Sequence, residues 1–272
     1  SVKTKKRLLL TATPFVNDVC DFISIINILY GKVLINRLSQ LANPEKLGIY
    51  LKGKVYYIKK RKTINDQYPV YSEKYIYIDM PKQYQEDYCR LIQGGEVNSL
   101  VFTNPKSFYN AHRRAVNKIG ASEDYFSLKL DKAVSLIENY KSIIYTNWIN
   151  YGTEPIQEKL RKHKITYGVF TGRISEIQKK NVVDRFNNNE FQVLILSSSG
   201  KEGLDLKEVR KVIVMDPVWN FSGIKQIKGR AIRYKSHTNL PIEEKKVDIY
   251  YLVLKTNKRY CLSGDTVLYN II

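Results

Sequence analysis

Two arginines near residue 230 have a spacing suited to phosphate chemistry. Arg230 and Arg233 follow Gln226 by four and seven positions, which places the three side chains on one face of an α-helix. Gly229 has no side chain, so another surface could come close to this face. A guanidinium group binds two oxygens at once and keeps its charge, and it is therefore suited to a transferring phosphoryl group.

A loop of small residues lies upstream of these arginines, between two apolar runs. Residues 193–196 and 212–215 have the length and the unbroken apolar character of strands buried on both faces. Residues 197–205, Ser-Ser-Ser-Gly-Lys-Glu-Gly-Leu-Asp, begin where the first strand would end. Backbone N–H groups in such a loop can approach a phosphate or a sugar closely. The pattern predicts two parallel strands and a polar floor for a ligand.

The elements that position these residues begin near residue 128. Strand-like runs follow there, with helical stretches between most of them, at 142–145, 166–170, 193–196, 212–215 and 247–254. Ser175 and Gln178 form a capping box at the head of one such helix. This alternation is typical of βαβ units, so we predict an α/β fold with a parallel sheet flanked by helices.

The arginine-bearing stretches resemble a known family. Residues 203–206, Gly-Leu-Asp-Leu, and the Gln-x-x-Gly-Arg-x-x-Arg of 226–233 are similar to motifs V and VI of superfamily 2 helicases and translocases. Residues 216–220, Asp-Pro-Val-Trp-Asn, resemble the Swi/Snf branch and its viral relatives, the poxvirus-type nucleoside triphosphate phosphohydrolase I and early transcription factor ATPases. The other resemblances are motif III at 11–14, motif IV at 144–148 and, at 170–173, a turn that touches the nucleic-acid backbone.

This resemblance implies a RecA-like second helicase lobe and a role for each matching residue. Arg230 and Arg233 would be catalytic arginine fingers that reach the γ-phosphate of ATP. Gly203 and Asp205 would lie beside the nucleotide ribose or relay closure of the lobes, and Gln226 would help to sense the nucleotide. The residues that would contact nucleic acid are Trp148, Thr171, Gly172, Ser197 and Ser198. Thr11 and Thr13 would couple the nucleotide state to that contact.

Simpler interpretations remain open for some of these residues. The arginines could solvate an exposed helix face, and Trp148 could be a buried aromatic side chain that stacks on no base. Asp216 ends an apolar run as a Walker B aspartate would, but in this family that role belongs to the first lobe. We therefore expect Asp216 only to orient its loop.

The sequence lacks the parts that would hold a nucleotide. Residues 48–54 spell Gly-x-x-x-x-Gly-Lys, but Val55 lacks the hydroxyl that would bind Mg²⁺, and no Asp-Glu box occurs. ATP and Mg²⁺ would thus be held by an N-terminal RecA-like lobe of the full-length enzyme, and this chain alone would bind neither and be inactive. The alternative is a non-catalytic module, derived from a helicase lobe, that binds nucleic acid or a partner.

The resemblance also suggests a domain layout. Residues 1–30 would end the first lobe with motif III and its following helix, 31–126 would form a linker and insertion region, and 127–256 the RecA-like lobe. Residues 257–272 would be a C-terminal extension. Within it, residues 261–266 resemble the opening of an intein, with Cys261 as the nucleophile. Ser263, Asp265, Leu268 and Tyr269 also fit continuation of the viral helicase family, which we favour.

Composition points to a polyanionic partner. Forty-five Lys and Arg against 26 Asp and Glu give a net charge of +19, which favours nucleic acid over membrane, although a generic basic surface is the alternative. We expect DNA rather than RNA, and viral transcription machinery is a further candidate partner. The three cysteines form no metal pattern and predict no disulfide framework. We expect an intracellular protein, acting in the host cytoplasm or the virion if viral.

Overall fold

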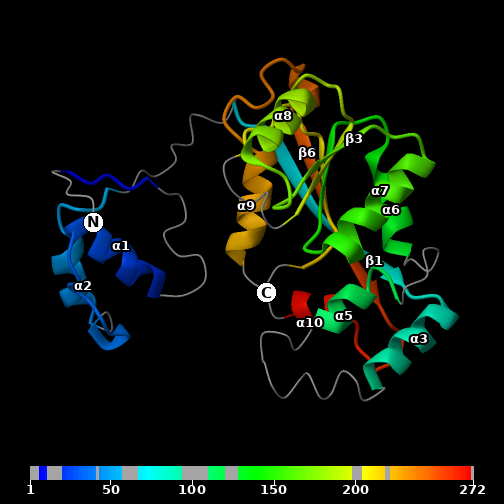
Figure 1. Ribbon diagram of the computed structural model, residues 1–272, viewed down its shortest axis with the longest axis horizontal. Helices are drawn as coiled ribbons and strands as arrows, with labels where there is room; N and C mark the ends of the chain where they lie inside the picture. The colour runs from blue at the N-terminus through cyan, green and yellow to red at the C-terminus, as the bar shows by residue number, and fades with distance from the viewer. Residues whose placement is uncertain are drawn as a thin grey trace. The chain divides into compact units, whose positions relative to one another are not determined.

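The chain consists of two compact units, residues 1–64 and 65–272. The computed structural model describes residues 6–10, 20–40, 43–56, 67–93, 110–119, 128–197, 204–217 and 221–270. In the first unit, helix α1 (Cys20–Tyr30) ends before Gly31, whose φ of +70° suits glycine, and helix α2 (Pro44–Leu51) follows (Figure 1). Thr11 and Thr13 of the predicted motif III lie outside the described residues.

The second unit is built on a six-stranded, wholly parallel sheet with the strand order β1-β6-β5-β2-β4-β3. Its strands are β1 (Val70–Asp79), β2 (Ser142–Tyr145), β3 (Tyr167–Phe170), β4 (Val193–Leu196), β5 (Lys211–Val214) and β6 (Lys246–Lys255). The five strands predicted from the sequence are all present. The predicted α/β fold with a parallel sheet is thus confirmed.

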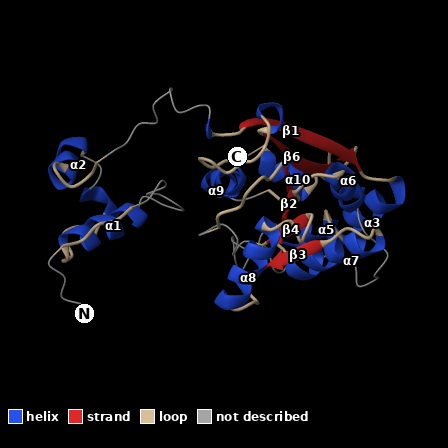
Figure 2. Cartoon of the chain, turned by 90° about the horizontal axis from the view of Figure 1, so that it is seen from above, coloured by secondary structure: helices blue, strands red, loops and turns tan. Residues whose placement is uncertain are grey.

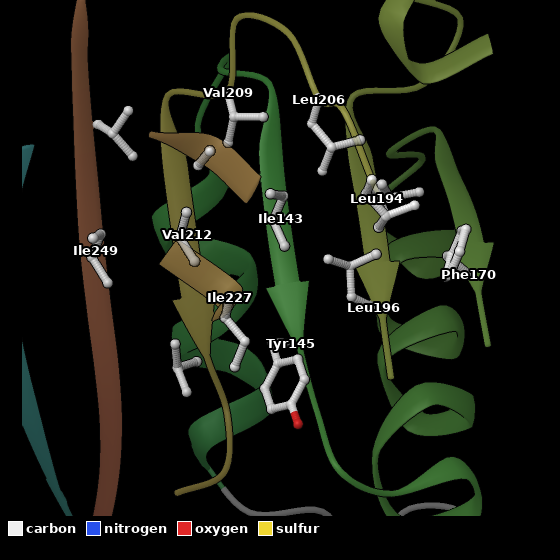
Figure 3. Packing of buried hydrophobic residues seen from close by; sticks show 14 of the residues in the cluster. Ile143, Tyr145, Phe170, Leu194, Leu196, Leu206, Val209, Val212, Ile227 and Ile249 are labelled. Carbon is white, nitrogen blue, oxygen red and sulfur yellow. The ribbon is translucent and has the colours of Figure 1, made fainter. Parts of the chain in front are cut away.

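Helices cover both faces of the sheet. Their bounds are α6 (Leu128–Ile137), α7 (Glu154–Lys162), α8 (Glu176–Asn187) and α9 (Phe221–Ala231). Successive side chains of a strand point to opposite faces. Ile143, Leu194 and Val212 therefore pack in the cluster that includes residues of α8 and α9 (Figure 3). Ile144, Ile195 and Ile213 pack in the cluster that includes residues of α6 and α7. The two pairs of helices lie on opposite sides of the sheet (Figure 2).

The sheet extends beyond the region predicted as the lobe. Strand β1 pairs in parallel with β6 over its whole length, from Val70 beside Lys246 to Asp79 beside Lys255. Its residues lie in the part of the sequence that we assigned to a linker region. The strand is at the edge of the sheet and mostly exposed, so it lacks the continuous apolar run of the central strands.

A small helical cluster closes the end of this edge of the sheet. It contains α3 (Lys82–Gln93), α5 (Asn110–Ala115) and α10 (Gly264–Tyr269). The hydroxyl of Tyr84 on α3 donates to the carbonyl of Ala115 at 2.6 Å, and the backbone N–H of Gly264 donates to the hydroxyl of Tyr88 at 2.9 Å. Ser263 caps α10 by accepting from the N–H of Thr266. This ordered helix fits continuation of the lobe.

The prediction of no disulfide was wrong. Cys89 on α3 and Cys261 form a disulfide bond, and both residues are buried. The physical reason lies in the topology, because β1 and β6 are parallel and the segments that follow them leave the sheet at the same edge. None of the helices in the described ranges has the length and apolar character of a membrane span.

Candidate functional site

The carboxyl ends of the central strands bring several predicted residues to one edge of the sheet. Thr171 follows β3 and Ser197 follows β4, and the N–H of Ser197 donates to the carbonyl of Phe170 at 3.1 Å. The N–H of Thr146, after β2, donates to the carbonyl of Leu196 at 3.0 Å. In open α/β sheets ligands bind outside the carboxyl ends of strands, so this edge is a candidate ligand surface.

Asp216 organises this edge from within. Its buried carboxylate accepts hydrogen bonds from Thr146 Oγ1 at 2.6 Å, from the N–H of Asn147 at 2.9 Å and from Asn117 Nδ2 at 2.7 Å. A Cβ atom at Gly152 would lie 2.0 Å from Thr146 Oγ1, so glycine is required there. Asp216 therefore fixes the loops after β2 and β5, as expected.

The predicted nucleic-acid contacts differ in how accessible they are. Thr171 and Ser197 are buried, and Thr171 Oγ1 accepts from the N–H of Arg173 at 3.3 Å. Gly172, which follows Thr171 in the turn after β3, is exposed, and Trp148 is half-buried. Ser198 lies outside the described residues. Contact of this group with nucleic acid stays a prediction.

Arg230 and Arg233 do not share one helix, because α9 ends at Ala231. The expectation that Gln226, Arg230 and Arg233 share one helical face is therefore wrong for Arg233. Beyond the end of the helix, the hydroxyl of Ser236 accepts a hydrogen bond from the backbone N–H of Arg233 at 3.3 Å. Gln226 lies on α9, half-buried, one turn before Arg230.

The two arginines nevertheless meet at a single point of the loop after β4. The Nη1 atoms of Arg230 and Arg233 lie 3.4 Å and 2.9 Å from the carbonyl oxygen of Leu204. Arg233 Nη1 also lies 3.0 Å from Asp205 Oδ1. The structure thus joins the two stretches that resemble motifs V and VI, although Gly203 lies outside the described residues.

The ion pair between Arg233 and Asp205 is open to solvent. The side chain of Arg233 is 40% exposed and that of Asp205 is 69% exposed. An ion pair this exposed contributes less than about 1 kcal/mol, so Arg233 can exchange Asp205 for another anion at little cost. A pocket of about 310 Å³ adjoins the same loop and is lined by Phe170, Glu176, Lys179, Lys180, Val183, Leu204 and Asp205.

A second ion pair is fully buried, and the sequence analysis did not predict it. Lys129 Nζ on α6 lies 2.7 Å from Asp265 Oδ2 on α10, and both side chains are 0% exposed. Lys129 also donates to the carbonyl of Met215, and Asp265 accepts from the N–H of Leu254 at 2.9 Å. Burial raises the pKa of Asp265 to about 6, and the charge of Lys129 opposes that shift.

The described parts of the chain contain no group of three or more His, Cys, Asp or Glu side chains that could hold a metal ion.

The sequence analysis did not identify Asn117, Arg113 or Lys129 as site residues. Asn117 and Arg113 lie in the region predicted as insertion, and a lysine within a helix usually faces solvent. The apolar neighbours Leu128 and Leu130 gave no indication that the side chain of Lys129 is buried.

The fold and this site define a class of protein. Residues 128–235 match the model of the helicase conserved C-terminal domain. The crystal structure of the C-terminal part of the Fun30 ATPase domain superposes with a TM-score of 0.56 at 14% identity, covering 75% of this chain and 89% of that one. The helicase domain of Pyrococcus furiosus Hef gives 0.52 at 16% identity, with 95% and 71% covered. These likenesses show a RecA-like fold.

The relatives narrow the class. A protein of Acanthamoeba polyphaga mimivirus named as an ATP-dependent RNA helicase is 30% identical over 297 residues, which is 97% of this chain and 65% of that protein. Nucleoside triphosphatase I of Melanoplus sanguinipes entomopoxvirus is 28% identical over 164 residues, covering 57% and 25%. Residues 128–235 are therefore a helicase C-terminal lobe of the superfamily 2 type, with viral nucleoside triphosphatase I among the relatives of this chain, as the motifs predicted. It spans only part of these relatives' length.

Proposed function

We propose that the chain is the C-terminal part of an ATP-dependent, nucleic-acid-stimulated translocase and supplies arginine fingers to its nucleotide site. The observation that carries this proposal is the convergence of Arg230 and Arg233 on Leu204. Both guanidiniums are held by the backbone of one loop while the Arg233 side chain keeps 40% of its surface in solvent. An arginine placed in this way is positioned and still accessible to a phosphate.

The chemistry follows from the side chains. ATP with Mg²⁺, held by a preceding RecA-like lobe, would supply the phosphoryl group. On closure of the two lobes Arg233 would leave Asp205 and bind γ-phosphate oxygens, stabilising the charge that develops there. Arg230 would add a second guanidinium, and Gln226 and the Gly203–Asp205 loop would report the presence of the nucleotide. The side chain of Arg233 suits this role, because its present partner is weakly held.

The nucleic acid would lie across the carboxyl edge of the sheet. Thr171, Gly172, Ser197 and Ser198 would face its backbone, and Trp148 would lie beside it. The net charge of +19 supports a polyanionic ligand. Opening and closing of the lobes, coupled through Thr11 and Thr13, would move the strand. We propose DNA as the ligand, and the name of the mimivirus relative makes RNA the comparison to test.

We also propose a cellular location and a domain layout for the protein. The viral relatives support a viral origin. We propose that the protein works with viral transcription machinery in the host cytoplasm or the virion. We propose residues 1–30 as the end of the first lobe, 31–126 as the linker region and 127–256 as the second lobe, with β1 added to its sheet. Residues 257–272 would be the extension.

Turnover measurements test the arginine assignment. In a protein that contains both lobes, Arg233→Ala should lower nucleic-acid-stimulated ATP hydrolysis by about 10³-fold or more, because an arginine finger contributes about 10³–10⁵ in rate. Arg161→Ala is the matched control. Arg161 is an exposed arginine near the end of α7, which leads to the amino end of β3 and so lies away from the carboxyl edge of the sheet. Unchanged turnover in Arg233→Ala would remove the assignment. The present chain alone should not hydrolyse ATP.

A further inference from the structure

Arg114 on α5 stands out among the basic side chains at the carboxyl edge of the sheet. Its guanidinium lies over two aromatic rings, 4.9 Å from the ring centre of Trp148 and 5.6 Å from that of Tyr151. The side chain is exposed. Within the described ranges it makes no hydrogen bond or ion pair. Its N–H donors are therefore available while aromatic contacts limit its movement.

The helix that carries Arg114 is fixed to the rest of the site. Arg113, the preceding residue, lies 5.1 Å from the ring centre of Trp148 and donates from Nη2 to the carbonyl of Pro217 at 3.2 Å. Asn117 Nδ2 bonds Asp216 at 2.7 Å. These contacts tie α5 to the loop between β5 and α9. Arg114 is thus presented from an ordered element, which reduces the entropy cost of binding a ligand.

A second arginine reaches the same short turn. Arg173, in the stretch that resembles a nucleic-acid contact, lies 3.5 Å from Asn150 Oδ1 through Nη2 and 3.5 Å from Glu154 Oε1 through Nη1. Asn150 and Tyr151 both belong to the π-helical turn Ile149–Thr153. Arg114 and Arg173 therefore approach one turn from two different elements. Together they extend the proposed nucleic-acid surface onto α5, which the sequence placed in the insertion region.

We propose that Arg114 binds a phosphate of single-stranded nucleic acid at this edge of the sheet, with Trp148 and Tyr151 holding the guanidinium in place. This inference rests on the proposed function, because it names a contact of the same surface. A polyanion is the fitting ligand for an exposed arginine that has no carboxylate partner within the described structure. The contacts with the two rings do not use the N–H donors of the guanidinium, which leaves its fork for bidentate phosphate binding.

Salt-dependent binding to labelled oligonucleotides tests the contact. Fluorescence anisotropy of single-stranded DNA and RNA should be recorded with the chain over a series of salt concentrations. Arg114→Ala should weaken binding about 5- to 10-fold at low salt and reduce the slope of log K against log salt by about 0.7, the value for one phosphate contact on a single strand. Arg114→Lys should keep most of the slope because it keeps the charge. The control Arg161→Ala should match the wild type.

Three results would overturn the inference. The first is an Arg114→Ala protein with the affinity and slope of the wild type, and the second is an equal loss in Arg161→Ala. The third is a wild-type chain that binds no oligonucleotide, or that binds polyglutamate equally well, because the surface would then not select nucleic acid. None of these results touches the assignment of Arg233, which is judged by ATP turnover in the two-lobed protein. The two proposals can therefore fail separately.

Discussion

Two ion pairs of this lobe have nearly the same length and opposite surroundings. Lys129 and Asp265 are 2.7 Å apart with no exposed side-chain surface, whereas Arg233 and Asp205 are 3.0 Å apart with 40% and 69% of their side chains exposed. The buried pair must keep its partners, because a lone charge in the interior is very unfavourable. The exposed pair can separate at little cost. Burial therefore distinguishes the pair that maintains the fold from the pair that can act on a ligand.

The surrounding contacts deepen this contrast. The buried pair joins α6 and α10 and also engages the backbone of Met215 and Leu254, at the ends of β5 and β6. It thereby supports the base of the loop that leads to α9. In the described part of the chain, the Arg233 side chain hydrogen-bonds to a single loop, through Leu204 and Asp205. In the proposed closure of the two lobes, the buried pair would stay in place while Arg233 changes its partner.

The largest effect on stability should come from breaking the buried pair. Lys129→Met leaves Asp265 buried without its counter-charge and should lower the free energy of unfolding by about 3–5 kcal/mol. Urea unfolding at neutral pH measures this. The double variant Lys129→Met with Asp265→Leu should regain most of the loss, because it removes both charges. A single variant as stable as the wild type would contradict the role given to this pair.

The disulfide should rank next. Reduction of Cys89–Cys261 releases a cross-link between residues 172 positions apart and should lower stability by about 2–4 kcal/mol. The comparison is between urea unfolding with and without a thiol reductant. Cys89→Ala with Cys261→Ala serves as the control and should be insensitive to the reductant. Equal stability of the oxidised and reduced wild type would show that this bond contributes nothing.

A pH series sharpens the description of the buried carboxyl. Its pKa of about 6 in the folded protein exceeds the unfolded value of about 3.9, so the native state holds a proton that the unfolded chain has lost. The resulting stabilisation is complete below about pH 3.9 and is lost as pH rises through 6. The unfolding free energy of wild type minus that of Asp265→Asn should thus fall by about 2–3 kcal/mol from pH 4 to pH 7.

His237 supplies an internal check on that series. Burial lowers the pKa of His237, whose ring nitrogens contact Ser236 Oγ and the carbonyl of Val209. This group therefore stabilises the fold above about pH 6.5, and that contribution declines on acidification. Because His237 is present in both proteins, its contribution cancels in the difference. A pH-independent difference would mean that Asp265 does not titrate as described.

The sequence predicted the parts of this fold that rest on local pattern. Buried parallel strands are unbroken apolar runs, so β2, β4, β5 and β6 could be predicted, and the capping box at Ser175 marked the start of α8. The spaced arginines and the Gly-Leu-Asp loop were found because each is a contiguous motif. Their meeting at Leu204 was not predicted, because it is a contact between residues 26 and 29 positions apart in the chain.

The missed features depend on contacts between distant parts of the chain. The pairing of the exposed edge strand β1 with β6, which makes β1 part of this sheet, was not predicted. That pairing in turn places Cys89 beside Cys261, which no spacing of three cysteines could indicate. The burial of Lys129 depends on α10, more than 130 residues downstream. Arg114 could not be identified from the sequence, because its contacts with Trp148 and Tyr151 form only in the fold.

We propose that the exposed side chain of Arg233 binds a ligand and contributes little to the stability of the fold. One preparation of Arg233→Ala, in a protein with both lobes, tests it most directly through paired measurements of ATP turnover and of urea unfolding. We expect turnover to fall by about 10³-fold or more, with a change of less than about 1 kcal/mol in the free energy of unfolding. Turnover equal to that of wild type, or a loss explained by unfolding, would contradict the account.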